Sequence, residues 1–82
     1  MRLNSTNFAR IESAALEGYA DMPDHGMELD VRGVLILGDD KLIVQYTLWD
    51  TRNNWRGGLK TAVVTSDSVQ ISYREDWITH KV

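Results

Sequence analysis

The residues with the clearest capacity for chemistry lie in one acidic segment. Residues 21–30 hold four carboxylates and one imidazole, that of His25. Carboxylates at this density can ligate a hard divalent cation. Their spacing, however, matches neither an EF-hand loop nor a pair of metal-binding histidines on a helix. Proline, aspartate and glycine are typical turn residues, so we predict a connecting loop and no metal site.

Catalytic side chains of other kinds are not brought together by the sequence. The chain has no cysteine, and its two histidines, His25 and His80, belong to no recognisable nucleophile or phosphate-binding motif. Gly57 and Gly58 precede no helix that could offer its N-terminus to a phosphate, so we interpret them as a β-bulge. We therefore expect no catalytic residue, no cofactor and no enzymatic activity.

A second group of residues is suited to binding. The segment 47–60 carries two tryptophans, two arginines and a lysine around Asn53 and Asn54. Tryptophan and arginine are enriched among the residues that dominate the energy of protein interfaces. An alternative is that Trp55 only forms a cation–π pair that stabilises its own hairpin. The residues that we predict to contact a partner are Arg32, Trp49, Arg52, Trp55, Arg56 and Lys60.

Size and composition limit the scaffold that can position these residues. A chain of 82 residues with 43% apolar and 26% charged residues is typical of one small globular domain. The absence of cysteine favours a reducing compartment, and we expect a cytoplasmic protein. The longest apolar run, residues 34–37, is far short of the ~20 residues that span a bilayer, so we expect no membrane partner.

The N-terminal residues predict a helix over residues 4–19. Asn4 is a suitable N-cap, and apolar residues follow at helical spacing. Alternating apolar residues separated by turn signals then predict strands over residues 27–37, 41–50, 56–65 and 69–74. The expected fold is α+β, with one helix packed on one face of a four-stranded antiparallel meander. Residues 75–82, which include Trp77, are either a tail or a short fifth strand.

The turns predict how the strands align. A two-residue turn at Asn53 and Asn54 pairs Tyr46 with Thr61 and Val44 with Val63. A turn centred on residues 39–40 pairs Leu35 with Val44, and a three-residue turn over 66–68 completes the meander.

This alignment assigns two rows to the face turned away from the helix. The first is apolar and consists of Ile36, Ile43 and Val64. It is either a dimer interface or a surface covered by residues 75–82. The second is largely basic and consists of Arg32, Thr47, Lys60 and Arg74.

Three functions remain open on these grounds. We expect first a non-catalytic module, such as an inhibitor, immunity factor or regulatory subunit, that docks this face and the hairpin tip onto a larger protein. A nucleic-acid-binding protein that uses the tryptophans and basic residues is the alternative. A self-associating structural subunit is the third.

Overall fold

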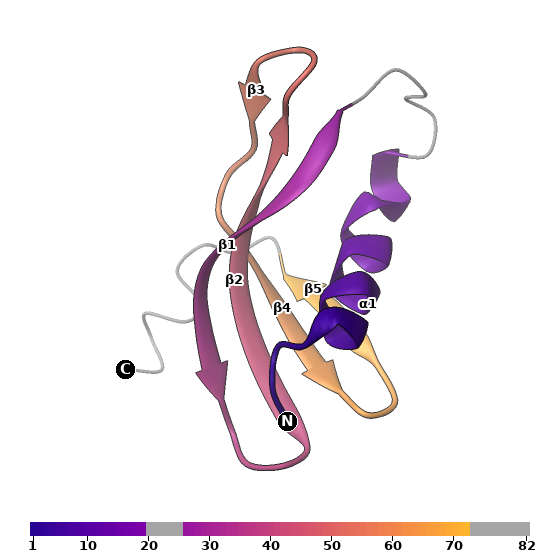
Figure 1. Cartoon of the computed structure of the whole chain (residues 1–82), viewed down its shortest axis with the longest axis vertical. Helices are drawn as coiled ribbons and strands as arrows, with labels where there is room; N and C mark the ends of the chain where they lie inside the picture. Colours follow the sequence, from indigo (N-terminus) through magenta and orange to yellow (C-terminus); the bar gives the residue numbers. More distant parts are fainter. Residues whose placement is uncertain (20–25, 73–82) are drawn as a thin grey trace.

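The computed structural model describes residues 1–19 and 26–72 of the chain. Helix α1 spans Ser5–Leu16 and continues as a 3-10 turn over Glu17–Tyr19. The strands are β1 (Met27–Ile36), β2 (Lys41–Asp50), β3 (Trp55–Arg56), β4 (Lys60–Thr65) and β5 (Val69–Ser72). They form an antiparallel sheet of order β1-β2-β4-β5, with β3 attached to β2 (Figure 1). The predicted fold, one helix followed by an antiparallel meander, is confirmed.

The helix begins where its capping residue predicts. The side-chain oxygen of Asn4 accepts a hydrogen bond from the backbone N–H of Asn7 at 2.9 Å, which satisfies one of the free donors of the first turn. Ile11 and Ala15, one turn apart, are buried. Asn7 is also buried, and its amide donates to the carbonyl oxygen of Arg2 at 2.8 Å.

The core lies between the helix and one face of the sheet, which we call the helix-side face. Four alternate residues of the central strand β2 and two of β4 supply most of it, and all six are buried: Leu42, Val44, Tyr46, Leu48, Ala62 and Val64. The helix contacts β4 and β5, and β1 is the opposite edge strand of the described sheet. The first half of β1 runs toward one end of the helix, whereas its second half lies away from the helix, beyond β2 (Figure 1). We call the opposite side of the sheet the outer face.

The predicted alignment of β2 with β4 was wrong by one residue. Tyr46 pairs with Lys60 and Val44 with Ala62, whereas Val63 pairs with Ile43. Since paired residues point to the same face and successive residues alternate, Tyr46 and Val63 lie on opposite faces.

The length of the connection explains this error. The turn between β2 and β3 contains four residues, 51–54, instead of two, and only Asn54 among them has a positive φ, of 50°. Trp49 pairs with Arg56 and Tyr46 with Lys60, so three steps along β2 correspond to four steps along the facing chain. The extra residue confirms the bulge predicted at Gly57 and Gly58.

Both remaining turns also differ from the prediction, the first in its centre and the second in its length. The amide of Leu37 donates to the carbonyl oxygen of Lys41, which leaves three residues, 38–40, in the turn between β1 and β2. Gly38 supplies the positive φ of 76° that this turn needs. Between β4 and β5, the amide of Thr65 donates to the carbonyl oxygen of Ser68. That turn therefore contains two residues, not the predicted three.

The alignment of β1 with β2 is consequently also shifted. Val34 pairs with Val44, and not Leu35 as predicted, because of the three-residue turn. A further shift between Val31 and Gly33 changes the register again toward the start of β1. The predictions for Arg74 and for residues 75–82, Trp77 included, lie outside the described residues. No helix in the described part of the chain is long and apolar enough to cross a membrane.

Candidate functional site

The six residues predicted to bind a partner lie on different sides of the sheet. Trp49 and Arg56 are cross-strand neighbours on the outer face, and Arg32 lies with them. Trp55 and Lys60 pair with Asp50 and the core residue Tyr46, which places them on the helix-side face. Arg52 lies in the turn between the two faces and is exposed. The single basic row was therefore wrong, because the one-residue shift moves Lys60 to the other side.

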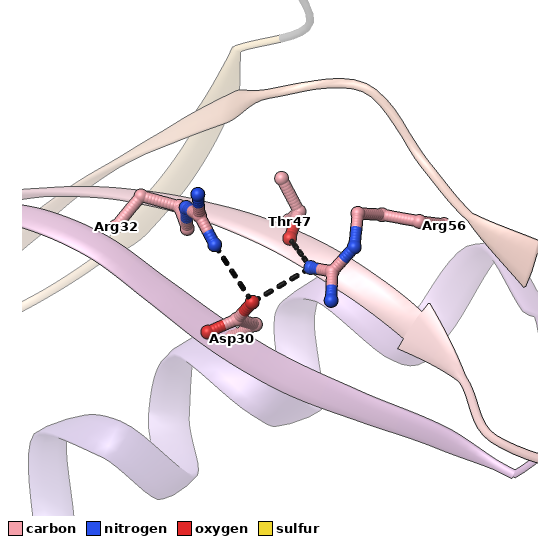
Figure 2. A network of polar contacts seen from close by, with 4 residues as sticks. All are labelled: Asp30, Arg32, Thr47 and Arg56. Atoms are coloured by element: carbon pink, nitrogen blue, oxygen red, sulfur yellow. Dashed lines mark hydrogen bonds and ion pairs between the residues drawn. The ribbon is translucent and has the colours of Figure 1, made fainter.

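On the outer face, Asp30 holds two arginines. Its Oδ2 accepts a hydrogen bond from Arg56 at 2.6 Å and one from Arg32 at 3.2 Å (Figure 2). Arg56 also donates to the hydroxyl of Thr47 at 2.7 Å, and its guanidinium lies 4.9 Å from the ring centre of Trp49. Hydrogen bonding from Arg56, with a smaller contribution from Arg32, lowers the pKa of Asp30 below its ordinary value.

This network compensates part of the positive charge on the outer face within the chain itself. Arg32 and Arg56 do not repel each other without compensation, because the carboxylate of Asp30 lies between them (Figure 2). Sequence analysis did not find the role of Asp30. In the true register Asp30 is directly opposite Thr47, a position that the predicted register gave to Arg32.

On the helix-side face, two aromatic rings and one ammonium group gather below the hairpin tip. The ring of Trp55 lies 6.4 Å from that of Tyr19 at an angle of 57°. The Nζ of Lys60 lies 5.6 Å from the ring centre of Tyr19 and 3.4 Å from its hydroxyl. Tyr19, Met27 and Trp55 line a mainly apolar hollow together with Asp50 and Asn53. Trp55 remains 44% exposed, so much of the ring is open to a partner.

One buried carboxylate holds the tip in shape. Oδ1 of Asp50 accepts hydrogen bonds from the backbone amides of Gly26, Arg52 and Asn53 at 2.9, 3.1 and 3.2 Å. Its Oδ2 accepts from the side-chain amide of Asn53 at 2.7 Å. The bond from the Asn53 side chain and then that from Gly26 lower the pKa of Asp50. A partner would therefore meet a turn whose conformation is already defined.

Gly26 joins the start of β1 to the same turn. Its carbonyl oxygen accepts from both the amide and the hydroxyl of Thr51, each at 3.1 Å. A Cβ at this position would lie 2.7 Å from the Thr51 hydroxyl oxygen and 3.1 Å from the backbone nitrogen of Arg52. The close approach of the two backbones therefore requires glycine.

The apolar row predicted from Ile36, Ile43 and Val64 is wrong, because the three residues do not lie on one face. Val64 is buried in the core and pairs with Leu42, and Ile43 is buried on the outer face. Ile36 pairs with Leu42 from the other side, so it lies on the helix-side face and is not in one row with Ile43. Exposed apolar side chains occur instead at four consecutive positions, residues 34–37.

The described residues contain no group of three or more histidine, cysteine, aspartate or glutamate side chains placed to hold a metal ion. The two histidines, and the carboxylates Asp21 and Asp24 of the acidic segment, lie outside the described part of the chain. Comparisons with protein-family models, with curated proteins and with solved structures found no match.

Proposed function

We propose that this protein is a small non-catalytic binding module, acting as an inhibitor, immunity factor or regulatory subunit that docks its hairpin tip onto a larger protein. The observation that supports this proposal is the exposed indole of Trp55 on a turn held by Asp50. An aromatic anchor beside a partly apolar hollow is typical of the residues that dominate interface energies.

The hydrogen bonds within the tip favour binding. Association must offset the entropy lost by loops and side chains that become ordered. At this tip Asp50 accepts three hydrogen bonds from the turn and one from Gly26. The ring of Trp55 already lies near that of Tyr19. Little ordering is left, so burial of the indole contributes more of its free energy to affinity.

The charges near the tip indicate the kind of partner surface. Arg52 is exposed in the turn and Lys60 lies over Tyr19 on the same side as Trp55. An apolar recess with acidic residues on its rim would complement an indole flanked by two cations. The outer face offers less, since Arg32 and Arg56 already share Asp30. The same pairing argues against the nucleic-acid alternative, which needs cations free to contact phosphates.

The test begins with the tagged protein and a cell extract, with and without nuclease, followed by mass spectrometry. A captured protein is then purified and its affinity measured by calorimetry for wild type, for Trp55→Ala and for Arg32→Ala as an outer-face control. We expect Trp55→Ala to weaken binding by roughly 30-fold, as for an interface residue worth about 2 kcal/mol. We expect Arg32→Ala to bind nearly as wild type does.

Two results would contradict the proposal. The first is equal affinity of Trp55→Ala and wild type for the purified partner. The second is capture that disappears only after nuclease treatment and shows a steep, log-linear salt dependence, which would favour nucleic acid.

A further inference from the structure

Strand β1 is an edge strand whose two halves differ. Among the described strands it pairs with β2 alone. Its first half carries Glu28 and Asp30 and ends in the register shift at Arg32. Charges and bulges are the features that protect sheet edges from pairing with other chains. Residues 33–37 have neither.

The unprotected half is apolar on both faces. Val34, Leu35, Ile36 and Leu37 are 47%, 49%, 56% and 41% exposed. Val34 and Ile36 pair with the core residues Val44 and Leu42, so they belong to the helix-side face. They remain exposed because the helix covers β4 and β5 and not this edge (Figure 1). A strand that paired with this edge would cover Val34 and Ile36 and so extend the hydrophobic core beyond β1.

The backbone at this edge is oriented for pairing. The amide of Leu37 donates to the carbonyl oxygen of Lys41 in β2, so the backbone N–H and C=O groups of Leu37 point toward β2. In an antiparallel ladder this direction alternates with a period of two, so Leu35 also faces β2 while Val34 and Ile36 face the open edge. Residues 34 and 36 can therefore donate and accept hydrogen bonds with another strand.

We propose that two copies of this chain pair antiparallel through residues 33–37, about a two-fold axis at Leu35. Val34 of each copy then pairs with Ile36 of the other, and the two pairs together form four backbone hydrogen bonds. Leu35 faces its own counterpart, and Leu37 lies opposite Gly33 of the second copy. The symmetric register centred on Val34 places Ile36 opposite Arg32. The register centred on Ile36 requires Val34 to pair with Gly38, which lies in the turn beyond β1 with a φ of 76°. The central register keeps all pairs within β1 and Leu37, and it matches apolar side chains at its three inner positions.

Charges at both ends of the paired segment are complementary. In this register Arg32, whose exposed side chain also bonds Asp30 of its own chain at 3.2 Å, is opposite Gly38 of the second copy. It is then next to the turn that holds Asp39 and Asp40. Both aspartates are exposed, and neither forms an ion pair within the described residues. By symmetry this contact occurs twice. Such end-to-end matching favours a second copy over an unrelated strand, which would have no reason to carry two carboxylates at that place.

The paired edge and the hairpin tip are separate surfaces. The turn between β1 and β2 lies at one end of the sheet and β3 at the other (Figure 1). The two-fold axis is perpendicular to the sheet, so both helices lie on the same face of one continuous sheet. The dimer therefore leaves both copies of Trp55 free, and this inference stands independently of the proposed function.

Cysteine cross-linking tests the register, because the chain has no cysteine of its own. In Leu35→Cys the two introduced residues face each other with Cα atoms about 4.5 Å apart, which is within the range of a disulfide. In the control Leu37→Cys they are four residues out of register, roughly 13 Å apart. We expect mild oxidation to link Leu35→Cys nearly completely and Leu37→Cys hardly at all. Equal linking of both variants would overturn the register.

Sedimentation equilibrium tests the dimer itself. Wild type is expected at twice the monomer mass, and Ile36→Lys at the monomer mass with an unchanged circular dichroism spectrum. Gln70→Lys, an exposed position on the other edge strand β5, is the matched control and should remain dimeric. The proposal would be refuted if wild type stayed monomeric up to a concentration of about a millimolar. A Kd of that size corresponds to a binding free energy of only ~4 kcal/mol.

Discussion

Two aspartates, Asp30 and Asp50, accept several hydrogen bonds each, and in both the ionised form is favoured. Asp30 accepts from two guanidinium groups at the surface, whereas Asp50 accepts from three backbone amides and one side-chain amide in a buried position. The first pair of contacts contributes little to stability because water screens it. The second set orders the turn that carries Trp55.

Asp50 should make the stability of the protein decrease at low pH. Its pKa in the folded state is lowered, mainly by the amide of Asn53. Its contribution to stability is therefore fully present above the unfolded value of about 3.9 and is lost as the pH falls through the lower folded value. We expect Asp50→Asn to be less stable than wild type near neutral pH and to lose less stability on acidification. Thermal midpoints measured over a pH series check this. The same series on Asp67→Asn, an exposed turn carboxylate, should follow wild type.

Thr61 is a buried residue at which a more apolar side chain should be tolerated. Among the described residues none forms a hydrogen bond with its hydroxyl. An unsatisfied buried polar group costs about 1–3 kcal/mol. We expect Thr61→Val, which keeps the β-branched shape, to raise the free energy of unfolding by about 1 kcal/mol or more. Urea denaturation would reveal it, and a clear loss of stability would show that the hydroxyl has an important partner.

At the level of elements, the hairpin of β2 and β3 depends on contacts from outside itself. Gly26 donates to Asp50 and accepts from Thr51, so the segment before β1 fastens the turn at the far end of β2. The bulge at Gly57 and Gly58 then returns the chain to β4. The tip is thus defined by two segments that are separate in sequence, the residue before β1 and the hairpin with its bulge.

A methyl group at Gly26 should disturb this junction. It would lie 2.7 Å from the Thr51 oxygen and 3.1 Å from a backbone atom that cannot move aside alone. We expect Gly26→Ala to destabilise the protein by about 1–3 kcal/mol, as for other overpacked sites. Gly33→Ala is the matched control, because its Cβ would meet only Gln45, at an ordinary 3.6 Å. Urea denaturation measures the free energy of unfolding of both variants. Equal losses in the two would contradict the role given to Gly26.

At the level of the whole molecule, the helix is too narrow to cover the sheet. It packs over β4 and β5 and leaves the helix-side face of β1 to solvent at Val34 and Ile36. A chain of this size buries only ~60% of its unfolded surface, so its stability as a monomer is modest. Pairing of two β1 edges would bury part of the apolar surface that remains.

Stability should consequently depend on protein concentration. A folded dimer that unfolds to separate chains has a thermal midpoint that rises with concentration by mass action. We expect the midpoint of wild type to increase over a hundredfold concentration range and that of Ile36→Lys to stay constant. Scanning calorimetry provides the measurement. A midpoint independent of concentration in both proteins would agree with monomers and contradict the paired edge.

The sequence alone was sufficient for the helix and for the order of the strands, although the strand predicted over residues 56–65 is divided into β3 and β4. Asn4 marks the helix start, apolar residues at helical spacing mark its buried side, and turn residues separate the strands. These features depend on interactions between residues close in the chain. The bulge after Arg56 was also predicted from its two glycines. The candidate residues Trp55 and Arg52 were correctly placed at the tip of a hairpin, and the exposure of Trp55 agrees with the role proposed for it.

The strand register was decided only by the tertiary structure. The residues 34–37, 42–44 and 62–64 are consecutive apolar runs, so each strand can turn either parity inward with little loss of burial. The choice then depends on turn lengths, and these are set by long-range contacts such as those of Asp50 with Gly26. That choice joined Asp30 to Arg56, buried Val64, exposed Val34 and placed Trp55 on the same side as Tyr19. Alternation along a strand is a local property, but the face that it turns to the core is not.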